Sequence, residues 1–208
     1  MASSIIHVAV ANEVNKVIKR DRKKLLIGSI APDISKHLGR KKIESHFQDQ
    51  DDDFPNLDKF LNKYNSYLND DFVLGYYIHL YTDYIWFKYF TRDFYNNGVI
   101  YKLDGTKAEI DKKEMIKYFY NDYTSLNIKL IDEYELDLDI FYEELPVLED
   151  IIKEIPMDKI QLIVDKTGII IENSKEKKEY IFDMDKVYKF ISLSVEYLLS
   201  DLKEKNIY

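Results

Sequence analysis

Residues that interrupt helices are scarce in this chain, and this scarcity limits the folds open to it. Its 208 residues include four prolines and six glycines. Proline removes a helix hydrogen bond and glycine costs backbone entropy, so a chain poor in both can form long helices. Apolar residues also recur every three or four positions, which is the period of an amphipathic helix. The sequence therefore predicts an all-α protein, a multi-helix bundle in a single domain over residues 1–208.

The helical period and the capping residues together predict where the main helices begin. One helix starts at Ser4, with Ser3 or Ser4 as its N-cap. A central helix starts at Asp70 or Asp71 and ends near Phe90. Further helices are predicted over residues 55–67, 109–128 and 183–205.

The remaining segments have weaker patterns. A short apolar segment covers 24–30, and the aspartate-rich residues 48–54 are predicted to form a loop. A small β-hairpin can form near 99–108. Residues 130–156 are predicted as short helices separated by prolines, whereas 157–171 fits either a helix or a hairpin.

Bulk composition restricts the classes of function. The net charge of −8 provides no general attraction for nucleic acid or anionic lipid, which bind clustered Lys and Arg. Basic segments over 16–24 and 40–42 are balanced by nearby acids, and we interpret them as solvated helix ends and loops. The absence of cysteine excludes disulfides and thiolate metal sites. No apolar run has the length of a membrane span and no signal-peptide pattern is present, so a cytoplasmic location without nucleic-acid binding or membrane insertion is predicted.

Side chains that can bind metals are concentrated in the first 83 positions. His79 and Asp83 stand four residues apart in the central predicted helix and therefore share one face. His7, Asp33 and His46 precede them. Imidazole and carboxylate groups suit zinc, manganese or iron. Each residue alone fits a structural role, such as a helix cap for Asp33, but together they predict a metal site at which separate helices or loops converge.

The same residues lie in motifs that resemble those of the zinc-dependent phospholipase C family, which is related in fold to the P1-type zinc nucleases. The motifs are His7, the segment Gly-Ser-Ile-Ala-Pro-Asp ending at Asp33, Ser-His-Phe around His46, and Gly-Tyr-Tyr-Ile-His-Leu-Tyr-Thr-Asp ending at Asp83. The resemblance implies an all-α bundle of the phospholipase C/P1 nuclease type. The resemblance covers residues 1–95, which contain the metal-site motifs, whereas residues 96–208 form a helical half that it does not match.

The resemblance also implies a role for each residue. Asp33, His46, His79 and Asp83 would surround one zinc ion, and His7 would bind a second ion that Asp83 bridges to the first. Asp33 also matches an aspartate to which the family assigns the general-base role. No histidine follows His79, so ligands for a third ion are missing and one or two ions are expected.

The resulting hypothesis is a metal-dependent hydrolase, a phospholipase C-like phosphoesterase that acts on a small phosphoester with Asp33 as its catalytic residue. The alternative is a non-catalytic helical domain with a structural or sensing metal site. A third interpretation has no metal and uses the acidic C-terminal half as a protein-binding surface. The His-Asp-doublet phosphohydrolases are disfavoured because no His-Asp pair occurs, and the run Asp49–Asp53 lacks the glycine and glutamate of an EF-hand loop. The sequence leaves the substrate and the oligomeric state open.

Overall fold

The computed structural model describes residues 2–51 and 53–208, and Asp52 of the acidic run lies outside them. The chain is mostly helical with one small three-stranded antiparallel sheet, which confirms the helical expectation. Within the described ranges, no helix is both long enough and apolar enough to cross a membrane. The helices are α1 (Ser4–Ile18), α2 (Arg22–Gly28), α3 (Ile34–His37), α4 (Leu57–Tyr64), α5 (Asp71–Ile85), α6 (Lys112–Glu133), α7 (Ile160–Glu172) and α8 (Met184–Glu204), and the strands are β1 (Tyr95–Asn96), β2 (Val99–Tyr101) and β3 (Lys107–Glu109).

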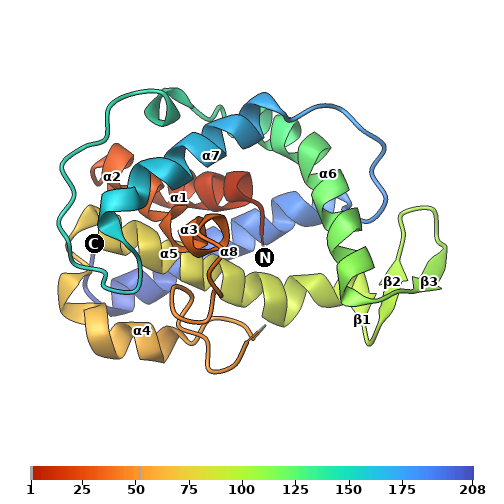
Figure 1. The fold of residues 1–208 in the computed structure, drawn as a ribbon, viewed down its shortest axis with the longest axis horizontal. Coiled ribbons are helices and arrows are strands. Elements are labelled where there is room, and N and C mark those ends of the chain that lie inside the picture. Colours follow the sequence, from red (N-terminus) through yellow and green to blue (C-terminus); the bar gives the residue numbers. More distant parts are fainter. Residues whose placement is uncertain (1, 52) are drawn as a thin grey trace.

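Helix α5 lies at the centre of the molecule, packed against α1, α2, α4 and α8 (Figure 1). Most of its residues are buried, as expected for a helix that is apolar on nearly all sides. Asp70 caps it by accepting hydrogen bonds from the backbone N–H groups of Phe72 and Val73, each at 3.0 Å. A π-helical segment, Trp86–Phe90, then continues α5 to the predicted end.

Helices α2 and α5 cross at two glycines that face each other. A Cβ atom added to Gly75 would lie 2.0 Å from the carbonyl oxygen of Leu25, and one added to Gly28 would lie 2.2 Å from that of Phe72. The two backbones are therefore too close for any side chain at these positions. This crossing sets the end of α2 against the middle of α5, one turn before His79.

Helix α1 begins where the sequence predicts. The Ser3 hydroxyl accepts a hydrogen bond from the N–H group of Ile6 at 3.2 Å. The helix ends at Lys19, which has a left-handed φ of 53° and whose N–H group donates to the carbonyl of Asn15. Asp21 then caps α2. This short reversal allows α1 and α2 to pack against each other and against α5.

The hairpin predicted near 99–108 is present as β2 and β3, with Ile100 paired to Ala108. The sequence did not predict β1, which pairs with β2 across Asn97 and Gly98. These two residues have φ values of 49° and 79°, as in a two-residue hairpin turn. The Asn-Gly pair therefore forms the turn that adds a third strand to the hairpin. The sheet lies at one end of the molecule, next to α6 (Figure 1).

The prediction of short helices over 130–156 is wrong for most of that segment. Helix α6 occupies its start, and the rest contains one 3₁₀ turn, Asp139–Phe141, among its described residues. Prolines and closely spaced acidic residues oppose helix formation here. Single apolar side chains such as Ile152 and Ile155 instead anchor the segment in the core. Residues 157–171 form α7 after a short 3₁₀ turn, and not a hairpin.

Candidate metal centre

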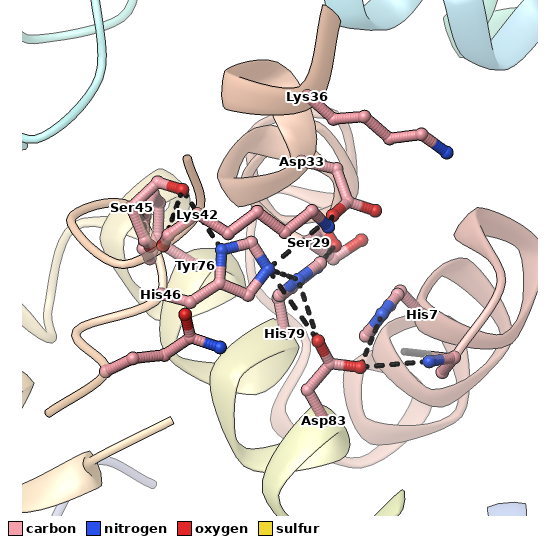
Figure 2. Close-up of polar contacts among 12 residues, drawn as sticks. His7, Ser29, Asp33, Lys36, Lys42, Ser45, His46, Tyr76, His79 and Asp83 are labelled. Carbon is pink, nitrogen blue, oxygen red and sulfur yellow. Dashed lines mark hydrogen bonds and ion pairs between the residues drawn. The ribbon is translucent and has the colours of Figure 1, made fainter. Parts of the chain in front are cut away.

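The structure brings together all five side chains that the sequence indicates as metal ligands (Figure 2). His7 lies on α1, Asp33 precedes α3, His46 lies in the loop after α3, and His79 and Asp83 lie on α5. Their exposed fractions range from 0% to 9%. Four separate parts of the chain therefore converge in the core, as the ligand spacing requires.

Helices α1 and α5 present three of these groups to one another. His79 and Asp83 are one helical turn apart and point to the same side of α5. The imidazole ring of His7 stacks on that of His79, with ring centroids 3.7 Å apart and an interplanar angle of 14°. His7 Nε2 lies 3.4 Å from Asp83 Oδ1. The packing of α1 on α5 thus joins His7 to the pair predicted from helical spacing.

Asp33 reaches the cluster because of the turn that begins at Pro32. Proline suits the first turn of a helix, and here it lies in the 3₁₀ segment Ala31–Asp33. Asp33 then occupies the N-terminus of α3, where a carboxylate often caps the helix. Its side chain makes no capping hydrogen bond. The carboxylate faces His46 instead, and so is available to a ligand.

The aromatic core holds His46 through the residues on either side of it. The ring of Phe47 packs edge-on against Phe60, with centroids 5.1 Å apart, and against Tyr76 at 6.3 Å. The hydroxyl of Tyr76 donates a hydrogen bond to the carbonyl of Ser45. Because both neighbours of His46 are anchored, its imidazole has a defined place in the cluster. Tyr76 therefore contributes to the packing of the core.

Three ligand atoms have mutual distances close to those of a tetrahedral metal site, and a fourth lies near one of them. His46 Nε2 lies 3.3 Å from His79 Nε2 and 3.5 Å from Asp33 Oδ1. Asp83 Oδ2 lies 3.7 Å from His46 Nε2 and 3.8 Å from His79 Nε2. Donor atoms bound tetrahedrally to zinc at about 2.0–2.1 Å are about 3.3–3.4 Å from one another. The ligand atoms of Asp33, His46 and His79, and those of His7, His79 and Asp83, lie within 4.8 Å of one another, so each group could hold an ion.

Additional hydrogen bonds orient two of the imidazoles. His79 Nδ1 lies 2.7 Å from the carbonyl oxygen of Ser29, which can only accept, so Nδ1 carries the proton. His46 Nδ1 lies 3.0 Å from Ser45 Oγ, whose own proton is donated to the carbonyl of Lys42. Both Nε2 lone pairs are therefore directed into the cluster. Metal-binding histidines are typically oriented by such bonds.

Some buried polar atoms of the cluster have no hydrogen-bond partner among the described residues. They are Asp83 Oδ2 and both ring nitrogens of His7. The other carboxylate oxygen, Asp83 Oδ1, accepts a hydrogen bond from the N–H group of Ala2 at 3.0 Å. Buried polar groups are nearly always paired, and a cation at the cluster would supply the missing partner. The donor types, their distances and these unpaired atoms all fit a metal ion.

The electrostatic environment favours the protonation states that bind metals. Burial lowers the pKa of His79 well below its ordinary value, and the neighbouring His7 lowers it further. Burial and the charge of Lys42 lower the pKa of His46. Burial acts to raise the pKa of Asp33, but Lys42 and the imidazoles hold it well below its ordinary value. Neutral imidazole and ionised carboxylate are the forms that coordinate a cation.

A cavity of about 590 Å³ lies beside the cluster and reaches it at Asp33 and Ala2. One part of its lining comes from α6 and is apolar. Another part comes from α3 and the loop after it and is basic. The apolar side chains include Met115, Ile116 and Phe119 of α6, and the basic side contains Lys36, Arg40, Lys41 and Lys42 together with the carboxylates of Asp51 and Asp53.

Sequence reasoning missed Lys42. The interpretation of segment 40–42 as a solvated loop is wrong for this residue, whose side chain is 17% exposed and whose ammonium group contacts Asp33 Oδ1. Ser29 and Ser45, which orient the imidazoles, were missed as well. Lysine and serine near a candidate ligand are common on any protein surface, so the sequence contains no signal that distinguishes them.

Comparisons with known proteins identify no relative of this chain. No family model matches it, and neither the curated proteins nor the solved structures include a similar protein. The function of the site must therefore be inferred from its geometry and from the motifs in the sequence.

Proposed function

We propose that this protein is a metal-dependent hydrolase of phosphoesters that holds one or two zinc ions in a helical bundle of the phospholipase C/P1 nuclease type. The observation that carries the proposal is the 3.3–3.8 Å spacing that links ligand atoms of Asp33, His46, His79 and Asp83 in the core. Two neutral imidazoles and two carboxylates form a set that zinc prefers, and manganese or iron would also accept it. The first ion would be held by Asp33, His46, His79 and Asp83.

A second ion would be held less completely. His7 Nε2 and Asp83 Oδ1 lie 3.4 Å apart on the other side of the carboxylate. Asp83 would therefore bridge the two ions, one through each oxygen. Because fewer side chains reach this second position, we expect one tightly bound ion per chain and a weaker second one.

The residues around the first ion suit hydrolysis of a phosphoester. A bound zinc ion would lower the pKa of a coordinated water toward about 7 and offset the charge on the phosphoryl oxygens. Asp33 is the one candidate ligand for this ion that lines the cavity, so it is placed to accept the proton of the attacking water. The apolar side chains of α6 would contact the alcohol part of the ester. Small phosphoesters with an apolar or aromatic alcohol are therefore the proposed substrates.

Access to the cluster favours catalysis over a purely structural ion. Structural zinc sites are closed by four protein ligands, whereas catalytic sites keep a position open to water or substrate, so catalysis at this four-ligand site requires the ion to accept a fifth ligand from the cavity. Here the cavity reaches the cluster at Asp33. A ligand entering the cavity would meet the ion on that side.

The experiment combines metal analysis with turnover. Purified protein is loaded with zinc or manganese, its metal content per chain is measured, and hydrolysis of 4-nitrophenyl phosphate and bis(4-nitrophenyl) phosphate is followed. We expect turnover by the wild type, and a loss of both bound metal and activity in His79→Ala. His37, which is half-buried and outside the cluster, provides the matched control, because His37→Ala should keep its metal.

Each outcome of this experiment has a definite meaning. Bound zinc without turnover of either substrate would refute the hydrolase and support the structural or sensing alternative. A wild type that binds no metal would refute both. Activity that persists in His79→Ala would show that the cluster is not the active site.

A further inference from the structure

Lys42 places a positive charge between the candidate metal cluster and the cavity. Its ammonium group contacts Asp33 Oδ1, the same oxygen that lies 3.5 Å from His46 Nε2 (Figure 2). The side chains of Lys42 and Asp33 are 17% and 12% exposed. Both residues line the cavity. An anion that enters the cavity and approaches the cluster at Asp33 would therefore meet this ammonium group.

The position of Lys42 is set by the loop that also positions His46. The carbonyl of Lys42 accepts a hydrogen bond from the N–H group of His46 at 2.8 Å and another from the Ser45 hydroxyl at 3.4 Å. The same hydroxyl accepts from the imidazole of His46. Lys42 is thus fixed relative to the cluster by the backbone that carries one of the ligands.

With one divalent ion bound, the two negative charges of Asp33 and Asp83 are neutralised. A phosphoester brings one or two more negative charges, so a further cation beside the ion would strengthen its binding. Among the described side chains, that of Lys42 contacts the cluster through its ammonium group, whereas Lys36 and Arg40 are exposed. Lysine binds phosphate oxygens as a mobile point charge, through charge-assisted hydrogen bonds.

We propose that Lys42 is the phosphate-binding residue of this site. When a metal ion takes Asp33, the ammonium group turns from that carboxylate toward the cavity and donates hydrogen bonds to a non-bridging phosphoryl oxygen. This inference rests on the proposed function. It predicts effects of opposite sign, because Lys42 assists phosphate binding but competes with the metal for Asp33. Removal of its charge should weaken phosphate binding and leave zinc binding equal or tighter.

The test uses the variant Lys42→Met, with Lys42→Gln as a second variant should the first fail to fold. Calorimetric titration measures zinc binding to metal-free protein, and then inorganic phosphate binding to protein that carries one equivalent of zinc. We expect the dissociation constant of phosphate to rise about 10- to 100-fold. Lys41→Met is the matched control: it removes the same charge one residue away, from a side chain that also lines the cavity but is 75% exposed and paired with Asp51 at 2.6 Å. Its phosphate affinity should stay within about threefold of the wild type.

The possible failures are distinguishable. Unchanged phosphate affinity in the Lys42 variants, with normal zinc binding, would overturn the role of Lys42 and leave the proposed function standing. Loss of zinc binding in both variants would overturn the phosphate-binding role of Lys42 as well, because Lys42 would then support the cluster itself. A zinc-loaded wild type that does not bind phosphate would have the same consequence. A wild type that takes up no zinc would end the proposed function and this inference together.

Discussion

Replacing Gly75 by alanine tests the helix crossing that positions the metal cluster. The added Cβ would lie 2.0 Å from the carbonyl oxygen of Leu25 and 3.0 Å from the Cα of Gly28. Non-bonded heavy atoms prefer separations of about 3.5–4.0 Å, so α2 and α5 would have to separate by roughly 1 Å or more. The obstacle is backbone, which cannot rotate away as a side chain can.

The expected loss of stability follows from two opposing effects. Overpacking a core typically costs about 1–3 kcal/mol, and a clash with backbone belongs at or above the upper end of this range. Alanine is the better helix former by about 1 kcal/mol, which offsets part of the cost. We therefore expect the free energy of unfolding to fall by about 2–3 kcal/mol, the difference between these terms.

Urea denaturation monitored by tryptophan fluorescence provides the measurement. Trp86 is the single tryptophan and is fully buried, so its emission reports unfolding of the core. Gly168→Ala in α7 is the matched control, because an added Cβ there would first meet the side chain of Tyr142 at 3.6 Å, an ordinary contact. This control should be stabilised by about 0.5–1 kcal/mol. The same substitution should thus have opposite effects at the two sites.

The crossing also affects the metal cluster. Gly75 lies one turn before His79, whose Nδ1 is 2.7 Å from the carbonyl oxygen of Ser29 at the end of α2. Separation of the helices would lengthen this bond and reduce zinc affinity by about tenfold, the lower end of the effect known for such orienting contacts. A Gly75→Ala protein that unfolds within about 1 kcal/mol of the wild type and binds zinc equally well would refute this account of the crossing.

Two further predictions concern groups outside the set of candidate metal ligands. Asp122 is fully buried and accepts hydrogen bonds from the N–H groups of three consecutive residues, 180–182. Asp122→Ala leaves these N–H groups unpaired, so the free energy of unfolding measured by urea titration should fall by at least about 3 kcal/mol. A fall below about 1 kcal/mol would contradict this role of Asp122. Burial raises the pKa values of Tyr76, Tyr77 and Tyr123. As the pH rises, the tyrosine hydroxyls lose their protons at a lower pH in the unfolded chain than in the folded one. The free energy of unfolding should therefore stay constant below about pH 10 and decline above it, by up to about 4 kcal/mol per pH unit for three such groups. Urea titrations between pH 8 and 11 measure this decline, and a flat profile would show that these hydroxyls are not buried.

The local features of this protein could be predicted from its sequence. Ser3 and Asp70 cap helices as their residue types indicate, because capping depends on backbone groups two or three residues away. His79 and Asp83 share a face because helix geometry alone fixes the direction of residues four apart. The hairpin near 99–108 follows from its turn residues in the same way.

Longer-range features were decided by the tertiary structure. Helical spacing does not say that α2 approaches α5 at paired glycines, that Ser29 orients His79, or that Lys42 contacts Asp33. These contacts join segments far apart in the chain, and they depend on how the whole core packs. The sequence by itself determined which side chains can bind a metal and which local elements carry them. Packing decided that these side chains meet in the core, because only burial of the core holds distant segments in a fixed relation.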